Sequence, residues 1–484
     1  MANKKKQLKP QQTTQQSQRT SPSATARWRP IVVEPAVVKR ISMRTTFEKV
    51  TSNGSIAAAA MVFGAILAVI VANSPAYEAV REFVEAPLGI TIGDFSTEIS
   101  VEIFVNDLLM SLFFLLVGIE LKYEMTVGEL TDPRKAALPM LAAVGGVAVP
   151  ALIYLLINSN GGVPSGWAVP IATDIAFALG VMSLMGSRVR GSTKVFFSTL
   201  AIADDILAII VIAVFYGRTP DIMWCAASLA AILILVCLNM GKVYSVRYYT
   251  IAGSLLWICM FNSGIHATLA GVIIAFALPS RSDIRLSNLG DWLGSQAGEL
   301  EDYYDDDDHI LGQHDFTSAA ASVERVMHHV TPPLQRVEHN MNVFVNFIVL
   351  PLFAFVNAQV RLVGVDMGTI LVSKVAQGAF FGAVLGKPLG IILVTFVLVK
   401  CGFSELPKGV TWPQIISVGL MGGIGFTMSI LIAGLGFTNP ADVLAAKCAI
   451  LVGSVTSAAL GASFLMLTQK GRSKPKRKPA RRSA

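Results

Sequence analysis

Two adjacent aspartates in the middle of an apolar segment constrain what this chain can fold into. Asp204 and Asp205 lie in the stretch Thr199 to Ala208, with roughly ten apolar residues on each side, as a membrane-spanning helix requires. An ionisable residue near a bilayer centre costs on the order of 2.5–3.5 kcal/mol. An aspartate pair at a helix end among the headgroups would avoid that cost, but the apolar flanks disfavour it. The pair therefore indicates an ion or proton site.

The composition supports a membrane protein. Hydrophobic residues make up 53% of the chain and charged residues 15%, and the mean hydropathy is +0.59, which is too apolar for a soluble domain of this length. The five cysteines show no CxxC or His/Cys spacing, so neither a disulfide framework nor a zinc site is indicated. The net charge of +7 comes from the two tails, which we interpret as topology signals and contacts to membrane lipid, not to nucleic acid.

Three regions follow from the pattern along the chain. Residues 1–48 and 468–484 predict basic cytoplasmic tails, the first of them disordered because it has few large apolar residues. Residues 49–467 predict a transmembrane domain with a cytoplasmic insert loop at 282–340, expected to be solvated and disordered. The expected spans, about twelve, are 55–74, 103–122, 137–158, 166–186, 194–217, 221–240, 246–261, 265–279, 341–360, 369–399, 413–436 and 441–467.

The loop charges predict the orientation. With both termini in the cytoplasm, Lys and Arg concentrate on the cytoplasmic loops, and among the loops only Arg81, Arg218 and Arg361 fall outside. Cytoplasmic loops of membrane proteins carry such an excess, so an even number of spans is expected. Between the first and second spans, the alternating segment from Leu88 to Val101 predicts a β-hairpin outside the membrane.

Two spans are expected to be broken. The fourth carries Pro170 before Thr173 and Asp174, and the eleventh carries a run of glycines from Gly419 to Gly425. These helices are the middle members of two triplets, spans three to five and ten to twelve, that run in opposite directions because seven spans separate them. The sequence thus predicts an all-α membrane protein with an inverted repeat and two discontinuous helices that cross at the midplane. Close helix packing remains the alternative for the glycines.

Broken helix ends carry partial charges, positive at N-termini and negative at C-termini. Asp174 follows the first break and could offset amide ends. Lys387, midway along the tenth span, could offset carbonyl ends and is too central to reach the headgroups easily. It therefore needs an anionic partner, for which Asp204 and Asp205 are the candidates.

Four further residues are candidates for a funnel or for pH sensing. Asp107 could line an outer funnel or cap its helix. Glu120 and Glu124 end the second span at the cytoplasmic surface, where they could form local ion pairs or gather cations. His266 could be a packing residue or a titrating switch.

Taken together, these segments resemble the NhaA-type sodium/proton antiporter family, over nearly everything from Phe47 to Leu467. The resemblance rests on Asn106-Asp107, FFLLVGIE from Phe113, PIATDIAFALG from Pro170, AIADD from Ala201, SGIHATLAGV around His266, LPLFAFVN from Leu350, GKPLG from Gly386 and GIGFTMS from Gly423.

The resemblance implies a main cation ligand at Asp205, with Thr173 near the site. It implies that Asp204 pairs with Lys387 and that Asp174 balances helix ends. It also implies electrogenic exchange activated at alkaline pH, and a homodimer whose contact includes the outer hairpin. The chain departs from the family in its long acidic insert, where weak divalent-cation binding is the alternative to a plain solvated loop, and in having Tyr123 where the family often has a basic residue.

The expected activity is transport and not catalysis, with no cofactor. A carboxylate site that is either protonated or sodium-loaded would exchange cytoplasmic sodium or lithium for external protons across a bacterial cytoplasmic (inner) membrane. The alternatives are a sodium-coupled organic-anion symporter of the same architecture and a passive cation channel. An intramembrane aspartyl protease would need a Gly-x-Gly-Asp motif, which the sequence lacks.

Overall fold

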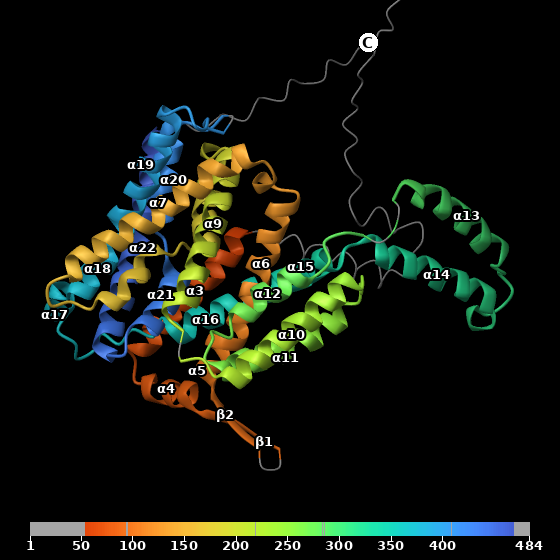
Figure 1. The fold of residues 1–484 in the computed structure, drawn as a ribbon, viewed down its shortest axis with the longest axis horizontal. Coiled ribbons are helices and arrows are strands. Elements are labelled where there is room, and N and C mark those ends of the chain that lie inside the picture. Colours follow the sequence, from red (N-terminus) through yellow and green to blue (C-terminus); the bar gives the residue numbers. More distant parts are fainter. Residues whose placement is uncertain are drawn as a thin grey trace, which may run out of the picture. The chain divides into compact units, whose positions relative to one another are not determined.

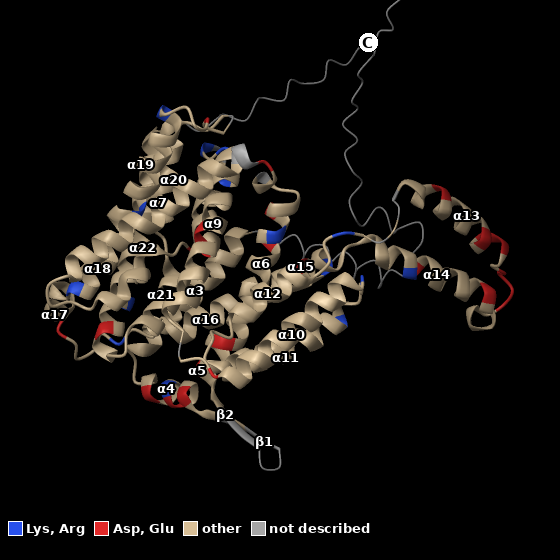
Figure 2. Cartoon of the chain, viewed as in Figure 1, with Lys and Arg blue, Asp and Glu red and all other residues tan. Residues whose placement is uncertain are grey.

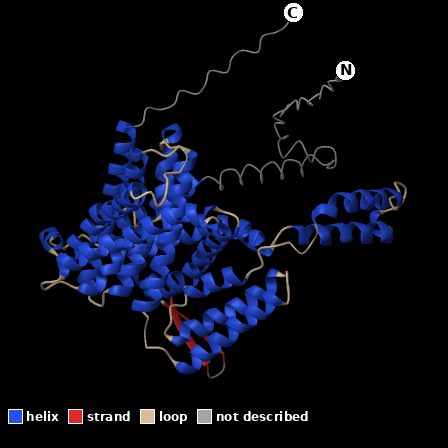
Figure 3. Cartoon of the chain, turned by 45° about the horizontal axis from the view of Figure 1, so that its top comes forward, coloured by secondary structure: helices blue, strands red, loops and turns tan. Residues whose placement is uncertain are grey.

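The computed structural model describes residues 54–92, 95–217, 219–282, 284, 286–407 and 409–468. The predictions for the two tails lie outside these ranges, apart from Thr468 at the end of the last helix. Within the described part, the chain forms helices joined by loops, with one pair of strands (Figures 1 and 3).

The elements occur in the following order. The first part of the chain forms α3 (Gly54–Ala72), α4 (Tyr77–Glu85), β1 (Pro87–Ile92), β2 (Phe95–Ser100), α5 (Val101–Ile103), η1 (Phe104–Leu109), α6 (Met110–Thr126), η2 (Glu129–Thr131), α7 (Pro133–Asn158), η3 (Pro164–Ile171), α8 (Ile175–Leu184), η4 (Gly186–Arg188), α9 (Gly191–Phe215), α10 (Ile222–Met240), α11 (Val246–Ser263) and α12 (Leu269–Ala277). The second part forms η5 (Leu286–Asn288), α13 (Leu289–Asp302), η6 (Ile310–Gly312), α14 (His314–Val330), α15 (Pro333–Phe344), η7 (Val345–Val349), α16 (Leu350–Asn357), α17 (Met367–Val372), α18 (Lys374–Phe381), η8 (Gly382–Gly386), α19 (Lys387–Lys400), α20 (Trp412–Gly422), α21 (Phe426–Gly436) and α22 (Pro440–Thr468).

The prediction of an all-α membrane protein is confirmed. Among the described residues, ten helical segments are long and apolar enough to cross a membrane. Many large apolar side chains on them are exposed, such as Phe63 at 66% and Leu156 at 73%. A soluble protein would not display so many, whereas lipid covers them in a bilayer.

Two of the twelve expected spans are not among these ten. They correspond to α11 and α12. Helix α12 has 9 residues, which at about 1.5 Å per residue reaches roughly half of a 30 Å hydrocarbon core. It packs closely on α6, because a Cβ on Gly271 would lie only 2.0 Å from the Ser111 carbonyl oxygen. Small residues let helix backbones approach in this way.

The expectation of an irregular, disordered insert at 282–340 is wrong. This segment contains α13, α14 and the start of α15, and its acidic residues are distributed over the first two helices and their connection (Figure 2). Gln313 closes the acidic turn, because its amide accepts from the Asp305 N–H and donates to the carbonyl oxygens of Asp305 and Asp308. A run of alanines in α14 also favours helix. Local hydrogen bonding and helix propensity therefore outweigh the repulsion between neighbouring acids.

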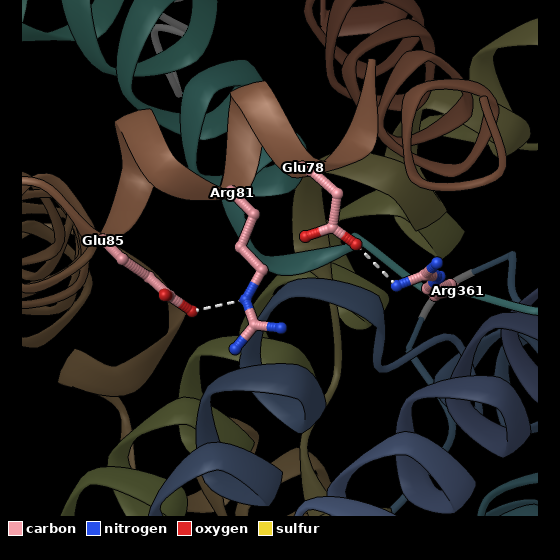
Figure 4. A network of polar contacts seen from close by, with 4 residues as sticks. All are labelled: Glu78, Arg81, Glu85 and Arg361. Carbon is pink, nitrogen blue, oxygen red and sulfur yellow. Dashed lines mark hydrogen bonds and ion pairs between the residues drawn. The ribbon is translucent and has the colours of Figure 1, made fainter. Parts of the chain in front are cut away.

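The predicted hairpin is present. Strands β1 and β2 pair antiparallel from Pro87 opposite Ser100 to Ile92 opposite Phe95. Helix α4 leads into it and carries two ion pairs (Figure 4), Arg81 Nε to Glu85 Oε1 at 2.7 Å and Glu78 Oε1 to Arg361 Nη1 at 2.9 Å. The second joins α4 to the connection that precedes α17. Because all four side chains are exposed, each pair contributes at most about 1 kcal/mol.

Both predicted helix breaks are present. The 3₁₀ helix η3 ends at Ile171 and α8 begins at Ile175, and α20 ends at Gly422 and α21 begins at Phe426. In each triplet the broken helix lies between unbroken neighbours along the chain. The first triplet is α7, η3 with α8, and α9, and the second is the α18–η8–α19 span, α20 with α21, and α22.

Candidate ion-binding site

The two helix breaks contact each other directly. The Asp174 N–H donates to the Ile424 carbonyl at 2.6 Å, and the Thr173 hydroxyl donates to the Gly422 carbonyl at 3.0 Å. Since Gly422 ends α20, Thr173 satisfies one of the carbonyl groups that a helix end leaves without a partner. The crossing is therefore held by hydrogen bonds between its extended segments.

One carboxylate caps two helices. Asp174 is the N-cap residue of α8, where its Oδ1 accepts from the Phe177 N–H at 3.0 Å. Its Oδ2 accepts from both the N–H and the hydroxyl of Thr427, in the first turn of α21, at 3.2 Å and 2.9 Å. A negative charge at a helix N-terminus offsets the positive end of the helix dipole. Here a single buried carboxylate does so for the second half of both broken helices.

A buried lysine lies at the opposite kind of helix end. Lys387 Nζ donates to the carbonyl of Ile171, the last residue of η3, and lies 2.5 Å from Asp204 Oδ2. Both charged side chains are fully buried. The structure thus brings Lys387 together with Asp204, one of its two candidate partners, and with a helix end.

Close packing of α19 against α7 places this lysine. A Cβ on Gly390 would lie 2.0 Å from the Gly145 carbonyl oxygen, so the two backbones touch. Lys387 itself directly follows the π-helical segment η8. Such segments insert one extra residue per turn and often occur at functional sites. The motif GKPLG marks this place in the sequence but does not predict the π-helical turn.

The two adjacent aspartates each retain an unused buried oxygen. Asp204 and Asp205 are 0% and 2% exposed, and the Oδ1 atom of each has no hydrogen-bond partner within the described ranges. Thr173 is a close neighbour of Asp204. Burying an ionised carboxylate oxygen without a partner is costly, so the pair is suited to bind a cation or a proton.

Neutral oxygen atoms also line the crossing. A Cβ on Gly425 would lie 2.7 Å from the Ala172 carbonyl oxygen and 2.4 Å from Ser429 Oγ, so both oxygens face this glycine. In the described part of the chain, no three His, Cys, Asp or Glu side chains are grouped to hold a metal ion, the acidic turn of the insert included. Carboxylate, hydroxyl and carbonyl oxygens are the ligand types that hard cations prefer.

The remaining candidates lie on other elements. Asp107 is half-buried in the π-helical segment η1, beside Asn106, whose Oδ1 accepts from Asn357 Nδ2 at 2.6 Å. His266 lies between α11 and α12, with its Nε2 2.8 Å from the carbonyl oxygen of Tyr216. Tyr216 is the C-cap residue of α9, so His266 contacts the end of the helix that carries the two aspartates.

Glu120 and Glu124 have a third acidic neighbour that sequence reasoning missed. Glu338, on α15, is among the charges that act on Glu120, as is Glu124. Glu120 lies on α6, which packs against α9, the helix that carries Asp205. Glu338 was overlooked because it falls within 282–340, the segment expected to be a loop. The signal that could have found it is Pro333, a good first residue for a helix that then continues into the ninth span.

We expect Asp174→Ala to lower the thermal stability more than Asp221→Ala. Asp221 is a matched control because its Oδ1 caps one helix, α10, by accepting from the N–H groups of Met223 and Trp224. Loss of an N-cap costs about 0.5–2 kcal/mol, and Asp174 caps two helices. Thermal unfolding in detergent measures the difference. Equal effects of the two substitutions would contradict the double role of Asp174.

The sequence of this chain is similar to those of known proteins. A model of the family described as Na+/H+ antiporter 1 matches residues 48–465. A Helicobacter pylori protein named Na(+)/H(+) antiporter NhaA is 40% identical over 418 residues, which cover 85% of this chain and 92% of the relative. Proteins of the same name from Oleidesulfovibrio alaskensis (39% identity, 84% and 90% covered) and Dichelobacter nodosus (37%, 89% and 93%) are also similar.

Proposed function

Because this chain belongs to the Na+/H+ antiporter 1 family, we propose that it exchanges cytoplasmic sodium or lithium for external protons. The protein is a multi-pass membrane protein. We place it in a bacterial cytoplasmic (inner) membrane with both termini in the cytoplasm, on the strength of the Lys and Arg bias of its loops. The relatives are named as antiporters, which fits a transporter that is not an enzyme.

The observation that carries this proposal is the pair of unused carboxylate oxygens on Asp204 and Asp205. Sodium and lithium are hard cations that bind oxygen, and Thr173 is a further candidate ligand. In the proposed cycle, Asp205 is the main ligand and is either protonated or bound to the cation, so that each ion displaces the other. A site that changes its exposure only when filled then couples the two fluxes.

Lys387 and Asp174 compensate charge in this proposal. Lys387 neutralises Asp204 and the C-terminal end of η3, and Asp174 neutralises the N-terminal ends of α8 and α21. If the Asp204–Lys387 pair opens when sodium binds and Lys387 gives up its proton, more than one proton moves per sodium ion. Exchange is then electrogenic.

Activation at alkaline pH is assigned to acids on α6 and α15. Glu120, Glu124 and Glu338 form a group of like charges, and Glu120 lies on α6, which packs against α9, the helix that carries Asp205. A change in the charge of this group would therefore be felt at the ion site. Asp107 and His266 are further candidates, Asp107 for an outer funnel and His266 for a switch at the end of α9.

We propose that two copies associate through the hairpin formed by β1 and β2. A two-stranded hairpin has unpaired edges that can pair with another chain. Membrane lipid is the other expected partner, and no cofactor is required for ion exchange.

The test is a fluorescence assay of the proton gradient in everted membrane vesicles from cells that lack other sodium/proton antiporters. Adding sodium or lithium should dissipate a preformed gradient, with a rate that rises with pH. Sodium flux that needs an organic anion would indicate the symporter. Sodium flux without proton counterflow would indicate a channel.

A further inference from the structure

Two buried serines of α22 lack the hydrogen bonds that such residues normally make. Ser454 and Ser457 are 3% and 1% exposed, and the hydroxyl of each has no partner within the described ranges. A helical hydroxyl commonly donates to the carbonyl four residues earlier, as Thr456 does to Val452 at 2.7 Å on the same helix. A buried hydroxyl without a partner costs about 1–3 kcal/mol. Two of them one turn apart require an explanation.

Ser457 faces the second helix break. A Cβ on Gly423, the first residue after α20, would lie 2.5 Å from Ser457 Oγ and also 2.5 Å from the Ala383 carbonyl oxygen. The two oxygens are therefore at most about 5 Å apart. One water molecule can bridge such a separation with two ordinary hydrogen bonds. Ala383 lies in the π-helical segment η8, directly before Lys387. Three features thus meet here: a helix break, a π-helical turn and an unpartnered hydroxyl.

One of the two serines has the same offset along its helix as one of the two aspartates. Helix α9 is the last member of the first triplet and α22 the last member of the second. Asp205 lies 14 residues after the first residue of α9, and Ser454 lies 14 residues after the first residue of α22. Asp204 lies beside the break of its own triplet, as Ser457 does. The last helix of each triplet thus has polar side chains beside the break of its own triplet, carboxylates on α9 and hydroxyls on α22.

We propose that Ser457 and the Ala383 carbonyl form a buried water-binding site beside the break between α20 and α21, and that its water also reaches Ser454, one turn earlier on the same face of α22. Water suits this site better than a cation, because the donor set carries no negative charge to offset the desolvation of an ion. Water also suits the two serine hydroxyls, because its oxygen can accept the hydrogen bonds for which they have no acceptor in the described part of the chain. A buried water typically makes two to four such bonds.

The role of this site rests on the proposed function. The residue before Gly423 is Gly422, whose Cβ would lie 4.0 Å from Lys387 Cγ, so this break is also near the stem of the buried lysine. A bound water can exchange partners while the backbone of the break shifts, and so lower the barrier to that shift. Removing both hydroxyls should slow exchange several-fold at saturating sodium and leave the half-saturating sodium concentration unchanged.

The decisive tests do not depend on transport. Ser454→Ala, Ser457→Ala and the double variant are compared with Ser417→Ala, a matched control whose buried hydroxyl joins the same two helices, α20 and α22, by donating to the Gly461 carbonyl at 3.0 Å. If water binds the serines, each substitution lowers Tm by about 1–3 °C, as in the control. If the hydroxyls are dry, their removal raises Tm or leaves it unchanged, which would overturn the proposal.

X-ray radiolytic labelling provides a direct probe, because hydroxyl radicals formed from bound water oxidise adjacent side chains. Met421 is fully buried and packs against Gly461, one turn along α22 from Ser457. It should be oxidised in the intact protein and several-fold less in the Ser454→Ala, Ser457→Ala variant. Met61, equally buried on α3, is the internal control.

The other possible results of these experiments also test the water site. Equal labelling of Met421 and Met61 would overturn the water site. If sodium raises the Tm of the intact protein but not of the double variant, the serines bind a cation, and the assignment to water is wrong. A protein that fails to transport sodium at all, but shows the expected labelling and Tm changes, would keep the water site and refute the proposed function.

Discussion

Asp205→Asn should reduce sodium-dependent proton efflux to the background of vesicles without the protein, while the variant still inserts into the membrane. The substitution removes the charge at nearly constant volume. Asp205 has an unused buried oxygen and no ion pair within the described ranges, so its loss leaves no orphaned partner. The protein should therefore be as stable as the unmodified one, or more stable, because a buried unpaired charge is removed.

A binding measurement separates this result from a simple transport defect. Sodium that binds only the folded protein raises its Tm in proportion to the logarithm of the sodium concentration above the dissociation constant. This rise should be lost in Asp205→Asn and retained in Asp221→Asn, which makes the same change at the N-cap of α10. Full transport or an unchanged sodium effect in Asp205→Asn would refute the assignment of this residue.

Lys387→Ala should lower both stability and transport. The lysine neutralises Asp204 at 2.5 Å and satisfies the Ile171 carbonyl, and all of this is buried. Removing one partner of a buried ion pair costs about 3–5 kcal/mol, because the other charge stays buried and unpaired. Thermal unfolding in detergent should show a large loss. Adding Asp204→Asn removes the remaining charge and should recover much of that loss. A double variant no more stable than Lys387→Ala would refute the ion pair.

The double variant also tests how charge moves during exchange. If Asp205 holds the cation and Lys387 carries one of the exchanged protons, exchange should persist with fewer protons per sodium ion and approach electroneutrality. If Lys387 only compensates helix ends, exchange should remain voltage-dependent. Sodium-dependent proton flux in proteoliposomes at imposed positive and negative membrane potentials distinguishes the two. An unchanged voltage dependence would rule out a proton-carrying lysine.

The membrane spans, the helix breaks and the acidic partner of Lys387 could be predicted from the charge and hydropathy of the sequence. The desolvation cost of Lys387 requires an acid nearby, which limited its partners to two residues, and Pro170 and the glycines indicated both helix breaks. Other features depend on contacts that a linear pattern does not contain. The bond from Lys387 to the Ile171 carbonyl and the close contact of α7 with α19 at Gly145 and Gly390 both join residues far apart in the chain.

For the insert at 282–340, the prediction from composition was wrong. A run of four aspartates predicted disorder, yet the described structure has two helices joined by a turn that Gln313 closes. Composition measures average repulsion and takes no account of a single amide that satisfies three backbone groups. The same error removed Glu338 from consideration, because the residue was assigned to a loop.

The shared carboxylate of Asp174 limits how the two broken helices can move. Its oxygens bond to the first turns of both α8 and α21, and its own N–H bonds to Ile424. Separating α8 from α21 would leave a buried N–H group of one helix without its acceptor, and each such group costs about 1–3 kcal/mol. The first turns of α8 and α21, which Asp174 joins, should therefore move together as one unit. Opening to alternate sides of the membrane then requires the surrounding helices to slide past this unit, so a cross-link between the first turns of α8 and α21 should be tolerated during transport.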